Sequence, residues 1–80
     1  MPKLKRLSGL DIVKILQNFG FATAGQKGSH IKLRRILKDG SQTLTIPRHK
    51  ELDKGTLQAI YRQASRYVDE DKLQPHFYTK

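Results

Sequence analysis

The chain has 80 residues, no cysteine, and sixteen Lys and Arg residues against seven Asp and Glu residues, which gives a formal net charge of +9. Such a length can bury only one thin core, so a second domain is excluded, and the lack of cysteine excludes disulfides and zinc–thiolate sites. Residues 1–68 carry fourteen basic and four acidic side chains, whereas residues 69–80 carry two lysines and three acids. A basic field of this size attracts polyanions, so nucleic acid is the leading partner class, ahead of an acidic protein or a membrane surface.

The N-terminal residues Met1–Arg6 are basic like the start of a signal peptide, but no apolar run of ~7–15 residues follows them. No segment approaches the ~18–20 apolar residues of a transmembrane helix. We therefore expect one soluble domain over residues 1–80, located in the cytoplasm.

A first helix is predicted over residues 8–19. Ser8, with Asp11 three residues later, forms a short version of the capping box that satisfies free backbone N–H groups at a helix N-terminus. Gly20 supplies a helix stop. Between them the apolar residues recur at helical spacing, at Ile12, Val13, Ile15, Leu16 and Phe19.

Three strands are expected next. A short strand spans residues 21–24, and a turn spans residues 25–28. From Ser29 the chain alternates between apolar and polar residues, which is typical of a strand with one buried face. Ile31 and Leu33 point one way, and His30, Lys32 and Arg34 point the other.

The dipeptide Asp39-Gly40 is a typical hairpin turn between two alternating runs. It predicts a returning antiparallel strand with Leu44 and Ile46 facing the core. Pro47 ends this strand because proline cannot donate to a sheet ladder.

One irregularity interrupts the strand before the hairpin. Leu37 keeps the inward parity of the earlier apolar residues, but Arg35 and Ile36 break the alternation. We expect a β-bulge or the twist near the hairpin end to absorb this break.

A second helix is predicted to begin near Thr56, after a polar connection over residues 48–55. Its apolar stripe consists of Leu57, Ile60, Tyr61 and Ala64. Residues 66–80 form a C-terminal tail, either partly helical or flexible, in which Pro75 closes any further helix and residues 76–78 are a short aromatic tail. The predicted fold is α+β in the order α-β-β-β-α, with both helices on the apolar face of a three-stranded antiparallel sheet.

The polar face of this sheet carries the first candidate site. His30, Lys32 and Arg34 occupy alternate positions, so their side chains rise together about 6.5–7 Å apart, and Lys27 stands on the preceding turn. Histidine can move protons near neutral pH. Lysine and arginine can hold a phosphodiester and stabilise the additional charge of its transition state.

Two small residues precede this histidine. Gly28 removes a Cβ where a backbone could approach the strand, and Ser29 adds a hydroxyl and an amide as phosphate donors. However, a histidine beside lysines on an exposed strand is more typical of solvated surface, and a glycine serves a tight turn equally well. The local residues alone therefore favour a plain surface over a site.

A second histidine, His49, lies between the strand-ending proline and the second helix. A lone histidine in such a place usually makes a hydrogen bond within its loop. Proton transfer as a pair with His30 would require both side chains to converge on one side of the molecule, which the sequence does not decide.

The sequence lacks a P-loop, a GxGxxG run, an HExxH run and any Cys/His metal spacing, and its seven carboxylates are scattered. A two-metal nuclease site is therefore not expected. We predict no metal and no cofactor, so any nuclease activity would be metal-independent.

Three runs of residues together resemble the HicA family of bacterial toxin–antitoxin systems. They are Gly20-Phe21, then Gly28-Ser29-His30, then Ile46-Pro47-x-His49-x-x-Leu52-x-x-Gly55-Thr56-Leu57-x-x-Ile60. The similarity covers about residues 7–65, the expected core of the domain. It implies a fold similar to a double-stranded RNA-binding domain.

The resemblance also implies a function. It implies an endoribonuclease toxin that cleaves mRNA, arrests translation and is neutralised by a HicB-type antitoxin. The family's catalytic histidine corresponds to His30. From the residues themselves we expect His30 to act as general acid or base, with Lys27, Gly28, Ser29, Lys32 and Arg34 as the RNA-binding residues. DNA would be contacted only indirectly, through the antitoxin complex.

Two other functions compete with this interpretation. One is a non-catalytic RNA-binding module of the same fold. The other is a DNA-binding accessory of the antitoxin complex, for which the chain offers no recognition-helix pattern. The second helix carries only Lys54 and Arg62 for phosphate contacts, which argues against a passive binder of duplex RNA.

Overall fold

A computed structural model describes residues 2–79. Its principal elements are α1 (Gly9–Gln17), β2 (Ala22–Lys27), β3 (His30–Leu37), β4 (Gly40–Pro47) and α2 (Lys54–Ala64). These five elements confirm the predicted order α-β-β-β-α. The remaining elements are β1 (Lys3–Leu4), α3 (Glu70–Phe77) and β5 (Tyr78–Thr79).

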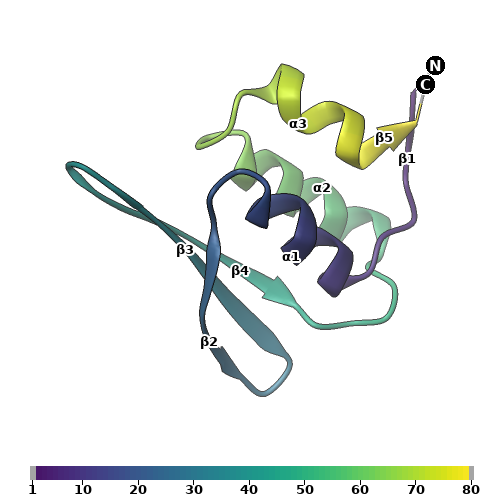
Figure 1. The fold of residues 1–80 in the computed structure, drawn as a ribbon. Coiled ribbons are helices and arrows are strands. Elements are labelled where there is room, and N and C mark those ends of the chain that lie inside the picture. The colour runs from purple at the N-terminus through teal and green to yellow at the C-terminus, as the bar shows by residue number, and fades with distance from the viewer. Residues whose placement is uncertain (1, 80) are drawn as a thin grey trace.

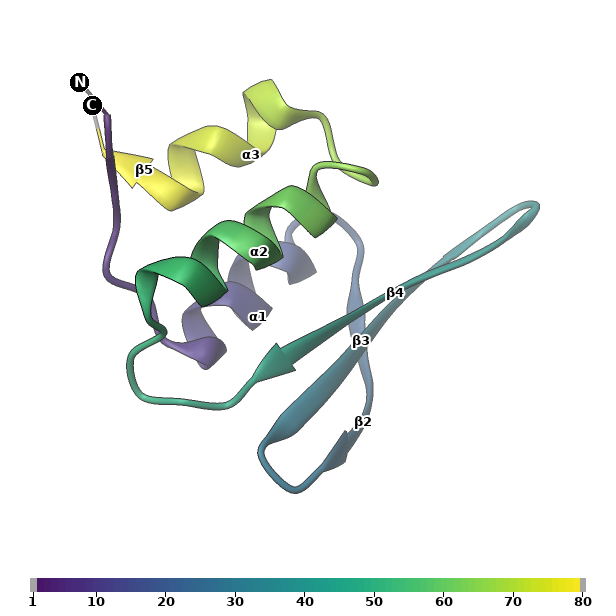
Figure 2. The same ribbon diagram turned by 180° about the vertical axis from the view of Figure 1, so that it is seen from behind.

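The three long strands form one antiparallel sheet in the order β2-β3-β4. The helices α1 and α2 lie on one face of this sheet, as predicted, and α3 lies on the far side of these two helices from the sheet (Figures 1 and 2). The core fills the space between the layers, because apolar side chains of the sheet and of both helices are almost wholly buried there. Examples are Ile12, Leu16, Leu33 and Ile46, each with no exposed surface.

The N-terminus of α1 is capped as the sequence predicts. The Ser8 hydroxyl accepts the Asp11 N–H at 3.0 Å, and the Asp11 carboxylate accepts the Ser8 N–H at 2.9 Å. The hydrogen bond from the Ser8 backbone lowers the pKa of Asp11. The helix begins one residue after Ser8 and ends at Gln17. The chain then turns through Gly20, whose φ of +94° is a conformation that glycine adopts without strain.

The first hairpin differs from the prediction. The strand expected over residues 21–24 is β2, which extends to Lys27, so most of the expected turn at residues 25–28 is strand. A register irregularity between Thr23 and Gly25 lets this edge strand continue past its glycine. The turn itself contains only Gly28 and Ser29, and Gly28 alone has positive φ (+59°), as a type II′ turn requires.

Of the two features expected to absorb the broken alternation, a β-bulge or the twist near the hairpin end, a bulge between β3 and β4 is absent, because their pairing is regular from His30 opposite Pro47 to Leu37 opposite Gly40. Leu37 is also not in the core and is 43% exposed. The two strands extend past the helices as a free ribbon, so an inward-facing residue near its tip finds no cover (Figures 1 and 2).

Arg35 lies on the same side of β3 as the buried residues Ile31 and Leu33, although a charged residue at this position breaks the alternation predicted from the sequence. Its guanidinium donates to three acceptors, namely Gln42 Oε1 at 2.8 Å, the Phe19 carbonyl at 2.9 Å and the Tyr67 carbonyl at 2.6 Å. It also lies 5.0 Å from the centre of the Phe21 ring. Arg35 therefore ties the chain just beyond the C-terminal ends of α1 and α2 to the sheet.

The prediction that Pro75 closes any further helix is wrong, because α3 runs from Glu70 to Phe77 with Pro75 inside it. Leu73 and Phe77 are spaced four residues apart and are fully buried, so one face of α3 is anchored in the core. Pro75 is exposed. Proline cannot donate the backbone hydrogen bond of a helix interior, and α3 tolerates this loss because its opposite face is anchored in the core.

The acids of the tail have structural partners. Asp69 caps α3 by accepting the Asp71 N–H at 3.0 Å. Glu70 accepts the Tyr61 hydroxyl at 3.1 Å, and burial, together with this hydrogen bond, raises the pKa of Tyr61 to about 12. After α3 comes β5, which pairs with β1 and brings Thr79 opposite Lys3.

Candidate active site

The predicted row of polar side chains lies on the face of the sheet that points away from the helices. His30, Lys32 and Arg34 are exposed, and the alternate residues Ile31 and Leu33 are buried with 4% and 0% of their surface exposed. The alternation predicted from the sequence is therefore confirmed. Because Ile31 and Leu33 pack into the core beneath this strand, the three exposed residues stand on a well-packed support.

Neighbouring strands add to the same face. In an antiparallel sheet, residues directly opposite each other project on the same side. Lys27 on β2 lies opposite His30, so these two side chains flank the turn at one end of the row. On β4, Thr45 lies opposite Lys32 and Thr43 lies opposite Arg34. The face thus presents three cations, one imidazole and two hydroxyls.

The turn that precedes His30 is held by hydrogen bonds at both of its carbonyls. Gln26 Nε2 donates to the Gly28 carbonyl at 3.1 Å, and the Arg48 N–H donates to the Ser29 carbonyl at 2.5 Å. A Cβ at Gly28 would meet nothing within 4 Å. This glycine is therefore required by its positive φ and not by a close backbone contact.

His49 lies at the same end of the sheet as His30, in the connection between β4 and α2. Its carbonyl accepts the Gly9 N–H at 2.9 Å, while its side chain is exposed. Within residues 2–79 no hydrogen bond joins the imidazoles of His30 and His49, so the structure provides no direct proton-transfer pair.

Gly9 is a residue that the sequence did not single out. A Cβ there would lie 2.0 Å from the Pro47 carbonyl oxygen and 3.0 Å from the Arg48 Cα. Only glycine lets the start of α1 approach the chain after β4 this closely. The contact fixes the connection that carries Arg48 and His49. No local pattern predicts it, because it joins segments far apart in the chain.

A hollow of about 470 Å³ lies at this contact. Its lining comes from the start of α1 and from the connection after β4, and it consists of Ser8, Leu10, Arg48, His49 and Lys50. Of these residues, only His49 is predicted from the sequence as a candidate site residue. The backbone hydrogen bond between Arg48 and Ser29 places this hollow next to the turn that carries His30.

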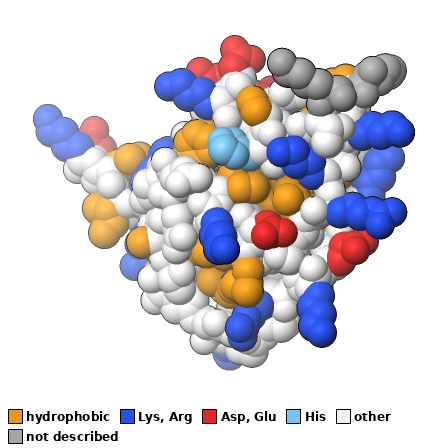
Figure 3. Space-filling model, turned by 45° about the vertical axis from the view of Figure 1, so that its right-hand side comes forward, with side chains coloured by type: hydrophobic (Ala, Val, Ile, Leu, Met, Phe, Trp, Pro, Cys, Tyr) orange, Lys and Arg blue, Asp and Glu red, His pale blue; other side chains and the backbone are white. Residues whose placement is uncertain are grey.

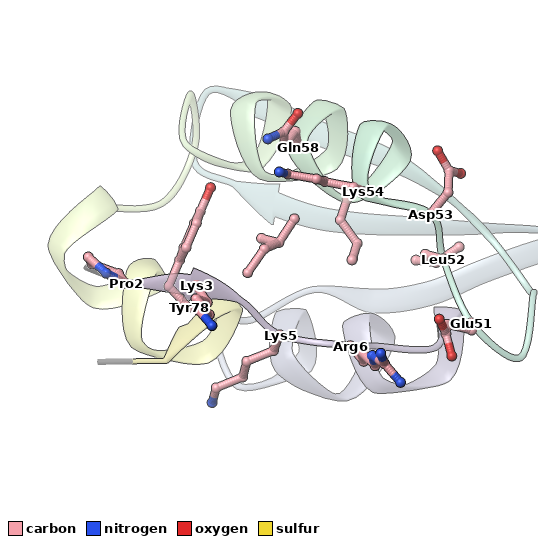
Figure 4. A pocket seen from close by; sticks show the side chains of 12 residues that line it. Pro2, Lys3, Lys5, Arg6, Glu51, Leu52, Asp53, Lys54, Gln58 and Tyr78 are labelled. Atoms are coloured by element: carbon pink, nitrogen blue, oxygen red, sulfur yellow. The ribbon is translucent and has the colours of Figure 1, made fainter.

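A larger hollow of about 660 Å³ lies elsewhere, between the N-terminal segment and the start of α2 (Figure 4). Its labelled lining includes Lys3, Lys5 and Arg6 on one side and Lys54 and Gln58 on the other. None of the predicted site residues lines it. Size alone therefore does not identify the candidate site.

The part of the chain that the structure describes contains no group of three or more His, Asp or Glu side chains arranged to hold a metal ion. In the same residues, no helix is both long enough and apolar enough to cross a membrane. Figure 3 shows one face of the molecule, where Lys and Arg side chains are spread widely and Asp and Glu side chains are fewer.

Comparison with known proteins gives one result. Residues 9–65 match the family model described as the HicA toxin of bacterial toxin–antitoxin systems. This segment begins with α1, contains the whole three-stranded sheet and ends one residue after α2. No curated protein and no solved structure matched the chain significantly. Because the matched segment is well over half of the 80 residues, the chain belongs to the HicA family of bacterial toxins.

Proposed function

We propose that this chain is a metal-independent endoribonuclease that cleaves mRNA and thereby arrests translation in the cytoplasm. The observation that carries the proposal is the position of His30, which is exposed on a strand packed on the core, between Lys27 and Lys32 on one face of the sheet. Family membership supports toxicity, and the net charge of +9 supports a polyanionic substrate.

In this mechanism His30 transfers a proton at the scissile phosphodiester. The nucleophile is either the ribose 2′-hydroxyl, which leaves a cyclic phosphate, or water. Lys27, Lys32 and Arg34 hold the phosphates and offset the charge that develops in the pentacoordinate transition state. A single acid–base group contributes about 10²–10⁴-fold to a rate, so the enzyme would be slow, yet a slow nuclease suffices to stop translation.

Single-stranded RNA is the substrate that fits this face. The polar residues lie along one strand of a sheet, where an extended chain can pass from Lys27 toward Arg34. The helix α2 offers few phosphate-binding groups, because its basic residues are only Lys54 and Arg62. A grip on duplex RNA across two grooves would need a longer basic surface on that helix.

The phosphate contacts predict a specific salt dependence. Replacing Lys27, Lys32 and Arg34 with alanine should remove three phosphate contacts, so the slope of log K against log salt for single-stranded RNA should fall by about 2. The measurement is fluorescence anisotropy of a labelled RNA at several salt concentrations. The matched control replaces Lys14, Arg62 and Lys72, which are exposed on the three helices. An equal change of slope in both triple variants would contradict the assigned interface.

The proposed partner is a HicB-type antitoxin that covers the active face, which is the exposed face of the sheet that carries His30, Lys32 and Arg34. Induction of this chain alone should arrest bacterial growth, and co-expression of the antitoxin should restore it. The accompanying measurement is the integrity of cellular mRNA. Growth arrest with intact mRNA would contradict the nuclease proposal while leaving the chain a toxin.

A further inference from the structure

The proposed mechanism gives no role to the hollow between the start of α1 and the β4–α2 connection. We name it the α1 pocket, and its lining is Ser8, Leu10, Arg48, His49 and Lys50. Its volume of about 470 Å³ lies within the range of small-ligand sites, about 300–1,000 Å³. The pocket contains no acidic side chain in its lining.

The walls of the α1 pocket are fixed to each other and to the active face. The Gly9 N–H bonds the His49 carbonyl at 2.9 Å, which joins the start of α1 to the connection. The Arg48 N–H bonds the Ser29 carbonyl at 2.5 Å, which joins the connection to the turn before His30. The α1 pocket is therefore joined through the backbone to the turn that immediately precedes His30.

The lining has the chemistry that holds an unstacked base. Single-stranded RNA is recognised by stacking splayed bases on histidine rings or arginine planes and by hydrogen bonds to their edges. His49 and Arg48 supply these groups. Leu10 is 47% exposed, so its side chain is accessible as an apolar contact for a base. Lys50 can hold the adjoining phosphate.

We propose that the α1 pocket binds the base of a nucleotide next to the scissile phosphate and determines the sequence at which RNA is cleaved. This inference rests on the proposed nuclease function. It assigns His49 to substrate recognition instead of proton transfer, which agrees with the absence of a hydrogen bond between the two imidazoles within the described residues. It also gives a role to Arg48, Lys50 and Leu10.

The test compares cleavage profiles on a pool of RNA with randomised sequence. Leu10→Ala and His49→Ala should each reduce the base preference at one position beside the cut by about tenfold, with the total rate of cleavage changed much less. The matched control is Leu37→Ala, because Leu37 is similarly exposed (43%) at the hairpin tip, away from the pocket. Thermal unfolding monitors whether each variant remains folded.

Two outcomes would overturn the inference. One is an unchanged base preference in both pocket variants. The other is a uniform loss of 10²-fold or more with every sequence in His49→Ala, which would make His49 an acid–base group.

A binding measurement separates failure of the pocket from failure of the nuclease proposal. Short single-stranded oligoribonucleotides are added to the isotopically labelled His30→Ala protein, and backbone amide resonances are followed by NMR. We expect shifts at Leu10, His49 and Lys50 as well as on the sheet. Shifts confined to the sheet, or pocket shifts only with an antitoxin protein, would overturn the inference, whether or not the wild-type protein cleaves RNA.

Discussion

The His30→Ala variant is expected to cleave RNA about 10²–10⁴ times more slowly than the wild-type protein while it binds RNA with similar affinity. His30 is the only titratable group on the exposed row that can exchange a proton near neutral pH, since its neighbours are Lys32 and Arg34. The cations that hold the phosphates remain in the variant, so binding should persist.

Two controls make this prediction specific to catalysis. His30 is exposed, so its replacement should change the free energy of unfolding by no more than about 0.5 kcal/mol. His30→Gln keeps a polar side chain that cannot transfer the proton, and it should be as slow as His30→Ala. A His30→Gln variant with wild-type rate would show that the residue acts by hydrogen bonding alone.

The second large effect concerns stability. Arg35→Ala should lower the free energy of unfolding by about 2–4 kcal/mol, because it removes hydrogen bonds from a charged group to the carbonyls of Phe19 and Tyr67 and to Gln42. The total stability of a chain of this length is about 4–12 kcal/mol, so the loss is a large fraction of it.

The measurement for Arg35 is chemical denaturation followed by circular dichroism. The matched control is Arg34→Ala, which removes the same side chain one residue earlier, where it is exposed. Arg34→Ala should change the stability by no more than about 0.5 kcal/mol. Equal stabilities of the two variants would contradict the role that the geometry assigns to Arg35.

The fold could be predicted from the sequence wherever a local pattern determines the structure. The capping box of Ser8 and Asp11, the alternation around His30 and the Asp39-Gly40 turn each depend on residues close together in the chain. These patterns gave the element order, the direction of each side chain in the exposed row and the packing of both helices on one face.

The predictions that were wrong or incomplete concern side chains whose contacts are with residues far away in the chain. Arg35 breaks the apolar alternation of its strand, and the sequence does not explain why, because its acceptors Phe19 and Tyr67 come from outside the strand. The local sequence predicts a helix end at Pro75, because nothing local shows that Leu73 and Phe77 are held by the core.

The site was predictable to a similar extent. The sequence placed His30, Lys32 and Arg34 on one face, and the pairing of β2 with β3 adds Lys27 to it. The α1 pocket could not be predicted, because it depends on the approach of Gly9 to Pro47 across the fold. Local spacing contains no information on that contact.

The central claim is that this chain cuts RNA by itself and without metal. The most direct test incubates the purified protein with an end-labelled single-stranded RNA in EDTA, beside the His30→Ala variant purified in the same way, and separates the products by length. We expect discrete fragments with the wild-type protein and intact RNA with the variant. RNA that stays intact although the wild-type protein binds it would rule out the nuclease and identify a non-catalytic RNA-binding module.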